Sequence, residues 1–155
     1  MPVLATNKRA NFDYKLLETL EAGLVLYGYE VKAVKDGHIS LKGSYVSFRY
    51  TATGSPELYL IGAHISKYRH AGNLPDYNPL RERKILLRNS EIKHLLGKKQ
   101  ENGLTLVPVK IYTKRSLIKM ELALAEGKKK FDKRDDLKKK DLDRQISTLM
   151  KRGLR

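Results

Sequence analysis

The stretch LIKMELALA, from Leu117 to Ala125, decides the fold class of this chain. Lys119, Glu121 and Ala123 separate its apolar positions, which are Ile118, Met120, Leu122 and Leu124. An apolar residue at every second position is the period of a strand that buries one face. We therefore predict a half-buried β-strand here.

Five further stretches are rich in residues that favour strands. They are Tyr14–Tyr27, Ser44–Tyr50, Leu58–Ile65, Arg83–Arg88 and Leu104–Tyr112. The cluster TGSP at 53–56 separates two of them and predicts a hairpin turn. Pro108 has no N–H for a strand ladder, so it predicts a sheet edge or a bulge. Gly23 and Gly28 are expected to mark a bend or bulge in the first stretch.

One helix interrupts the strands. Asn89 or Ser90 can cap its start, Gly103 can end it, and its apolar stripe consists of Ile92, Leu95 and Leu96. Short strands around a single helix predict a mainly β fold in the form of a small closed antiparallel barrel.

The stretch from Tyr68 to Arg81 is polar, contains Gly72, Pro75 and Pro79, and has no periodicity. We expect a loop, which serves either as a contact region or as a disordered excursion.

The charge of the chain favours a polyanionic partner. The 155 residues include 32 Lys and Arg against 17 Asp and Glu, a net charge of +15. Nucleic acid is the first expectation and an anionic membrane surface the second, because neutralised phosphates release counterions. Hydrophobic residues make up 41% of the chain, enough for a folded core.

The lack of cysteine excludes disulfides, thiolate zinc sites and a cysteine nucleophile, and it suits a reducing compartment. The sequence contains neither a secretory apolar segment nor a run of the ~20 apolar residues that span a membrane. We therefore expect one cytoplasmic folded unit.

The composition changes at Gly127. Residues 127–155 contain 12 Lys and Arg against 5 Asp, a net +7 within 29 residues. We predict a folded domain over 1–126 and a basic tail over 127–155. The tail has a thin apolar stripe at Leu137, Leu142, Ile146, Leu149 and Met150. An isolated helix of this kind is marginal in water, so we expect the tail to be disordered when free and helical when bound.

Enzyme chemistry has little support in the sequence. His38, His64, His70 and His94 have no metal-binding spacing, and no phosphate-binding glycine motif occurs. We therefore expect no catalytic residues, no metal site and no cofactor. Two alternatives stay open: a ribonuclease that assembles His64 with Lys or Arg across strands, and a structural ribosomal protein. Nine Tyr and three Phe lie among the basic residues and suit base stacking, although most of them also favour strands.

Five ordered blocks resemble the small protein B family, the SsrA-binding proteins of bacteria. They are NKRA at 7–10, EAG at 21–23 with GYEVK at 28–32, SYV at 44–46, RKILL at 83–87, and GKK at 127–129 leading into DKR at 132–134. The resemblance implies an oligonucleotide-binding-like closed barrel with flanking helices. It also implies a function: binding of transfer-messenger RNA, which arrives as alanyl-RNA with elongation factor Tu, and its delivery to stalled ribosomes for trans-translation.

The resemblance also assigns residues. For the tRNA-like domain it implies contacts from Asn7, Lys8, Glu21 and Leu86, with Arg9 and Lys84 as phosphate partners. For the decoding region and message channel of the ribosome it implies a tail that begins with Lys128, Lys129, Phe131, Asp132, Lys133 and Arg134. The plainer alternatives are a cross-strand ion pair for Glu21 and burial in the barrel for Leu86. Glu126 and Phe131 depart from the family pattern, which more often has a basic residue and His or Tyr there.

Overall fold

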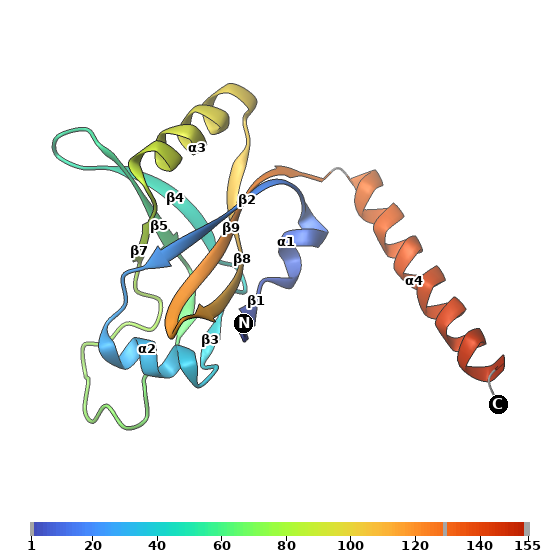
Figure 1. Cartoon of the computed structure of the whole chain (residues 1–155), viewed down its shortest axis with the longest axis horizontal. Helices are drawn as coiled ribbons and strands as arrows, with labels where there is room; N and C mark the ends of the chain where they lie inside the picture. The colour runs from blue at the N-terminus through green and yellow to red at the C-terminus, as the bar shows by residue number, and fades with distance from the viewer. Residues whose placement is uncertain (1, 129, 154–155) are drawn as a thin grey trace.

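The computed structural model describes residues 2–128 and 130–153, with nine strands and four helices in this part of the chain (Figure 1). The strands are β1 Val3–Thr6, β2 Tyr14–Leu24, β3 Ile39–Ser40, β4 Tyr45–Tyr50, β5 Pro56–Ile61, β6 His64–Ile65, β7 Arg83–Leu86, β8 Thr105–Lys114 and β9 Leu117–Gly127. The helices are α1 Lys8–Asp13, α2 Gly28–Lys35, α3 Asn89–Asn102 and α4 Lys130–Gly153.

Seven strands form one antiparallel sheet in the order β1-β8-β9-β2-β7-β5-β4, and β3 pairs with β6 separately. The prediction of a mainly β fold is confirmed. Closure of the barrel is not confirmed: within the described residues β1 pairs only with β8, and β4 only with β5. The sheet nevertheless curls enough to bring β4 next to β8.

The predicted strand at Leu117–Ala125 is confirmed as β9, which pairs with β2 on one side and β8 on the other. Met120, Leu122 and Leu124 are buried in the main core. Ala123 and Ala125 are buried as well, because Ala10 of α1 packs against them on the other side of the sheet. The strand is therefore half-buried only in its first part.

The other strand predictions hold in outline. The hairpin is formed by β4 and β5, with Gly54 at a positive φ of 85° in its turn. A register shift between Pro108 and Lys110 is the predicted bulge. Pro108 does not lie in an edge strand, because β8 has β1 and β9 on either side.

The predicted helix is confirmed as α3, and Gly103 ends it in the left-handed region at φ 62°. Its N-cap is Arg88, so Asn89 and Ser90 lie inside the helix instead of capping it. The expectation that Gly28 marks a bend in a strand is wrong: β2 stops at Leu24 and Gly28 begins α2. The resemblance implied flanking helices, but no pattern in the sequence placed α1 or α2.

The stretch from Tyr68 to Arg81 contains no helix or strand, as predicted, and runs alongside α2 (Figure 1). After β9 the chain enters α4, which extends away from the sheet (Figure 1). None of the helices in the described residues combines the length and apolarity that a membrane crossing needs.

Candidate nucleic-acid interface

A charged surface covers the side of the sheet that faces away from the core, across β8, β9, β2 and β7. We call it the outer face, and it consists of Glu21, Lys84, Leu86, Lys110, Tyr112, Lys114, Lys119 and Glu121. Strand register brings these residues together: Glu21 lies opposite Glu121, which lies opposite Lys110, and Leu86 lies opposite Gly23. Their neighbours along the strands, such as Met120 and Ile111, point into the core.

The carboxylate of Glu21 is positioned by Tyr112 and Lys114. The Tyr112 hydroxyl donates to its carboxylate, and Lys114 Nζ lies 3.3 Å from Oε1. The hydrogen bond from Tyr112 is the main reason why the pKa of Glu21 is lowered, with Lys114 adding to the effect. The alternative of an ion pair is found with Lys114 of β8, one strand beyond β9, but both side chains are well exposed, so it adds little stability. The carboxylate thus stays ionised and accessible.

A second carboxylate, which the sequence analysis did not single out, lies beside Glu21. Glu121 is its direct partner across β2 and β9 and pairs with Lys110, whose Nζ lies 3.4 Å away. Together with Tyr112 these side chains line a cleft of about 390 Å³. Only the register of β2 on β9 reveals this pair, because the two residues are far apart in the sequence.

Leu86 and Lys84 are exposed neighbours on β7. The side chain of Leu86 is not buried in the barrel; 48% of the residue is exposed. It packs over Gly23, where a Cβ would lie 3.4 Å from Leu86 Cβ. Lys84 Nζ lies 3.2 Å from the carboxylate of Glu57. An apolar side chain beside a cation suits contact with both a base and a phosphate.

Asn7, Lys8 and Arg9 lie where β1 passes into α1. The Asn7 side-chain amide donates to the Pro108 carbonyl at 2.9 Å, and its backbone N–H donates to the Val109 carbonyl at 2.8 Å. Asn7 therefore fixes the start of α1 against the bulge in β8. Lys8 and Arg9 are exposed and line a cleft of about 420 Å³ with Lys42 from the loop after β3.

Two of the predicted tail residues tie α4 to α1. Lys128 Nζ donates to the Asn11 carbonyl at 2.7 Å and also pairs with Asp136. Lys133 Nζ lies 3.1 Å from the carboxylate of Asp13. Arg134 is exposed. Lys129 lies outside the described residues, as do the side chains of Phe131 and Asp132, so these predictions stay untested.

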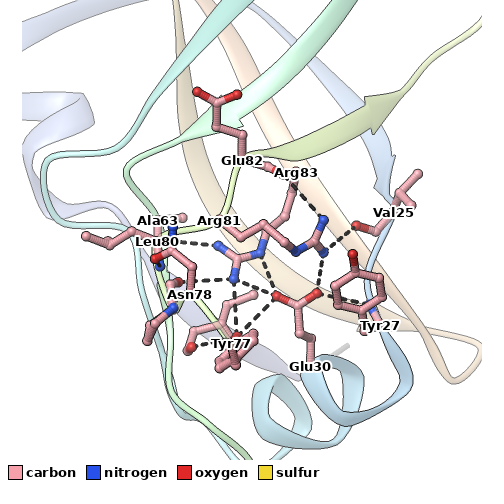
Figure 2. Close-up of polar contacts among 12 residues, drawn as sticks. Val25, Tyr27, Glu30, Ala63, Tyr77, Asn78, Leu80, Arg81, Glu82 and Arg83 are labelled. Atoms are coloured by element: carbon pink, nitrogen blue, oxygen red, sulfur yellow. Dashed lines mark hydrogen bonds and ion pairs between the residues drawn. The ribbon is translucent and has the colours of Figure 1, made fainter. Parts of the chain in front are cut away.

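A buried ionic cluster holds α2 to β7 and to the 68–81 loop. Glu30 and Arg83 both have fully buried side chains, and Arg83 Nη2 donates to Glu30 Oε2 at 2.6 Å. Arg81 pairs with the other carboxylate oxygen, and the Tyr77 hydroxyl donates to Oε2 at 3.2 Å. Figure 2 shows the carboxylate of Glu30 between the two guanidinium groups. The sequence motif contained Glu30 without revealing this role.

The cluster sets the ionisation of Glu30. Burial raises the pKa of its carboxyl, but hydrogen bonds from Arg81, the Tyr27 backbone N–H and Arg83 outweigh burial, so the pKa is lowered overall. The charged carboxylate compensates the buried guanidinium of Arg83.

Within the described residues, no group of three His, Asp or Glu side chains lies close enough together to hold a metal ion. His94 instead faces Glu18, with Nε2 at 3.0 Å from Oε2.

Comparisons with known proteins agree in one family. A family model described as SmpB protein matches residues 4–152. The chain is 45% identical over 154 residues to an SsrA-binding protein of Thermosipho africanus, covering 99% of each chain. It is 48% identical over 153 residues to an SsrA-binding protein of Ruminiclostridium cellulolyticum, covering 99% of this chain and 96% of the relative.

A solved structure described as "tmRNA-SmpB: a journey to the center of the bacterial ribosome" contains a similar chain. The TM-score is 0.63 and the identity 44%, over 84% of this chain and 87% of the other.

Proposed function

The chain belongs to the SmpB family of SsrA-binding proteins, and from this we propose that it binds transfer-messenger RNA and delivers it to stalled ribosomes for trans-translation. Trans-translation rescues the ribosome and tags the nascent peptide for degradation. The role is one of binding and delivery, not catalysis, and it requires no cofactor.

The outer face is the observation that carries this proposal. Glu21, Lys84 and Leu86 come from two neighbouring strands and are all accessible at the surface. Structured RNA is recognised through such mixtures: cations meet phosphates, a carboxylate accepts from base amino groups, and apolar side chains meet unstacked bases. Lys8 and Arg9 add exposed cations on α1.

The tail supplies the second RNA contact of the proposal. Helix α4 has 24 residues, which at ~1.5 Å per residue makes a rod of about 36 Å. With a net charge of +7 over residues 127–155, such a rod suits a channel lined by ribosomal RNA. We propose that residues 127–155 act there as a separate part, which folds on the ribosome at the decoding region and the empty message channel.

Three finer points belong to the same proposal. The transfer-messenger RNA would arrive as alanyl-RNA with elongation factor Tu. The protein would act in the cytoplasm, where ribosomes are. The curled sheet would work as an oligonucleotide-binding-like barrel, completed by packing of β4 against β8 in place of a hydrogen-bonded ladder; the proximity of these strands supports this view.

Binding of the purified chain to a transcript of the tRNA-like domain tests the proposal. We expect Glu21→Gln to weaken binding about tenfold or more, because a hydrogen bond to a charged group is worth ~1.5–3 kcal/mol. Asn7→Ala should weaken binding as well, since it releases the start of α1. Glu101→Gln on α3 is the matched control, because it removes another exposed carboxylate, away from the outer face.

A tagging assay on stalled ribosomes tests the tail separately. Deletion of the residues after Phe131 should abolish tagging and leave binding of the tRNA-like domain intact. Intact tagging after this deletion contradicts the role of the tail, and a joint loss of both activities contradicts the division into two parts.

A further inference from the structure

A third concave surface, outside the outer face, lies between α2 and the 68–81 loop. We call it the tyrosine pocket, and it is lined by Tyr27, Tyr29, Asn73, Asp76, Tyr77 and Arg81 with their neighbours. Its volume is about 360 Å³. Three aromatic rings, those of Tyr27, Tyr29 and Tyr77, line this one open pocket.

The rings are arranged as a stacking site. The Tyr29 ring lies edge-on to the Tyr77 ring, with centroids 5.2 Å apart and planes at 89°. Tyr27 lies 5.5 Å from Tyr29, and Arg81 Cζ lies 4.1 Å from the centroid of the Tyr27 ring. Tyr27 is 50% exposed although it takes part in both contacts. An aromatic side chain that is held in place and yet half exposed is what base stacking requires.

The buried ionic cluster makes this pocket rigid. Arg81 pairs with Glu30, and the Tyr77 hydroxyl donates to Glu30 and to the Ile65 carbonyl at 2.8 Å (Figure 2). Two of the pocket's walls are therefore fixed by a residue whose side chain is fully buried. A ligand that enters such a preorganised pocket loses little affinity to ordering of the protein.

The rim offers hydrogen-bonding groups. Asn73 and Asp76 are exposed at the mouth, where an amide and a carboxylate can read the edge of a base. The guanidinium of Arg81 lines the pocket beside the Tyr27 ring. Lys67 and Arg69, which are close to the pocket residues in the sequence, are exposed cations outside its lining. Aromatic rings flanked by cations are the common pattern of sites for single-stranded nucleic acid.

Backbone continuity joins the tyrosine pocket to the outer face. Lys84 and Leu86 belong to β7, and the Val25 backbone N–H, just after β2, donates to the Lys84 carbonyl at 3.0 Å. Tyr27 follows two residues later. The pocket residue Tyr27 therefore lies within a few residues of the strand pair β2–β7 that carries the outer face.

We propose that the tyrosine pocket binds an unpaired base of the same transfer-messenger RNA that the outer face binds, with the base stacked on Tyr27. This inference rests on the proposed function and gives the 68–81 loop a role in it, as a wall of a base-binding site.

The test compares Tyr27→Ala with Tyr27→Phe and with Tyr50→Ala in the full chain, using a transcript of the tRNA-like domain. Tyr50 is a matched control because it is 58% exposed and lies at the end of β4, outside the pocket. We expect Tyr27→Ala to raise the Kd about 5-fold to 150-fold, the range reported by alanine substitution of stacking residues. Tyr27→Phe keeps the ring and should bind like the unchanged chain, as should Tyr50→Ala.

A salt titration separates stacking from charge. Stacking releases no counterions, so the slope of log K against log salt should be the same for Tyr27→Ala and the unchanged chain. Ultraviolet crosslinking of the unchanged chain to the RNA gives a second readout that does not depend on the folding of any variant. We expect a crosslink between Tyr27 and a nucleotide that is unpaired in the tRNA-like domain.

Equal affinities of Tyr27→Ala and Tyr27→Phe, with no crosslink at Tyr27, would overturn the inference. So would a Tyr27→Ala defect that appears only in ribosomal tagging, because the base would then come from the ribosome. If Glu21→Gln weakens RNA binding and Tyr27→Ala does not, this inference fails and the proposed function stands. If the unchanged chain does not bind the tRNA-like domain, the proposed function itself fails.

Discussion

The carboxylate of Glu30 compensates Arg83, whose side chain has no contact with solvent. Glu30→Gln keeps the size of the side chain and removes the charge, which leaves a buried guanidinium uncompensated. We expect the free energy of unfolding to fall by about 3–5 kcal/mol, as for other broken buried pairs. Urea unfolding measures this loss.

Glu82→Gln is the matched control, because Glu82 pairs with Arg49 and both side chains are more than two-fifths exposed. Loss of such a surface pair costs at most ~1 kcal/mol. Equal losses in the two variants would mean that the buried cluster is no more important for stability than a surface pair.

The lowered pKa of Glu30 predicts how stability depends on pH. Burial raises the pKa of the Glu30 carboxyl, but hydrogen bonds from Arg81, Tyr27 and Arg83 outweigh burial, so the folded-state pKa lies below the ordinary value of about 4.5. The unfolded chain then binds the proton more readily, and the stability that Glu30 contributes is present above about 4.5 and is lost as the pH falls through the folded-state pKa.

Unfolding free energies between pH 7 and pH 3 measure this dependence. The unchanged chain should lose stability as the pH falls below about 4.5, and Glu30→Gln should show a flatter profile in the same window. If the stability of both chains falls in parallel with pH, the acid sensitivity comes from other carboxylates.

Lys84 is expected to contact a phosphate, so its replacement should change how RNA binding depends on salt. Lys84→Ala should weaken binding of the tRNA-like domain and reduce the magnitude of the salt slope by about 1, because one fewer phosphate is neutralised. Leu86→Ala, two residues further along β7, should weaken binding without changing the slope. Binding isotherms at several salt concentrations check both, and an unchanged slope for Lys84→Ala contradicts a phosphate contact.

At the scale of elements, periodicity predicted the strand and the helix in which apolar residues recur at regular intervals on one buried face. β9 has apolar residues at every second position, and α3 has an apolar stripe that ends at a glycine. α1 has only six residues, too few to show a period. α2 hides its pattern because one of its three buried residues is Glu30, which reads as a surface position unless its partners are known.

Only part of the site was predictable, because some of its contacts join residues that are far apart in the sequence. Glu21 and Leu86 came from the resemblance to a family. The structure adds that both are exposed and lie on β2 and β7, two strands that pair with each other. Glu121 and Tyr77 were missed because their partners lie far away in the sequence. Register and loop packing decide such contacts, and neither leaves a local signal.

Helix α4 has little packing to stabilise it. Its large apolar side chains, among them Leu149 and Met150, are about half exposed or more. We therefore expect amide hydrogens of α4 to exchange quickly in the free protein, because helices without tertiary packing open readily. Amides of β9 should exchange slowly, since β9 is paired on both sides.

Hydrogen exchange followed by mass spectrometry checks this on the full chain. Binding to a stalled ribosome should slow exchange in α4 selectively. Slow exchange of α4 in the free protein would contradict the view that the tail folds on binding.

At the scale of the whole molecule, the join between body and tail is tighter than composition suggests. The charge density changes at Gly127, but Gly127 still pairs with Tyr14 as the last residue of β9. Beyond it, the Lys128 backbone N–H donates to the Asp13 carbonyl at 2.9 Å, and Lys128 Nζ donates to Asn11. Both acceptors lie on α1, the helix that follows Asn7 and carries Lys8 and Arg9. The first residues of the tail therefore support one end of the RNA interface.

Two truncations separate the support of α1 by Gly127 and Lys128 from the role of the rest of the tail. A chain that ends at Lys128 keeps the hydrogen bonds to α1, so it should bind the tRNA-like domain within about twofold of the full chain, a difference of less than ~0.5 kcal/mol, while tagging is lost. A chain that ends at Glu126 loses the contacts of Gly127 and Lys128, each worth ~0.5–1.5 kcal/mol, so α1 should loosen and RNA binding should weaken as well. Affinity for the transcript and tagging on stalled ribosomes are measured for both chains. Equal RNA affinities of the two would show that α1 needs no support from Lys128, and the join between the two RNA contacts would then lie at Glu126.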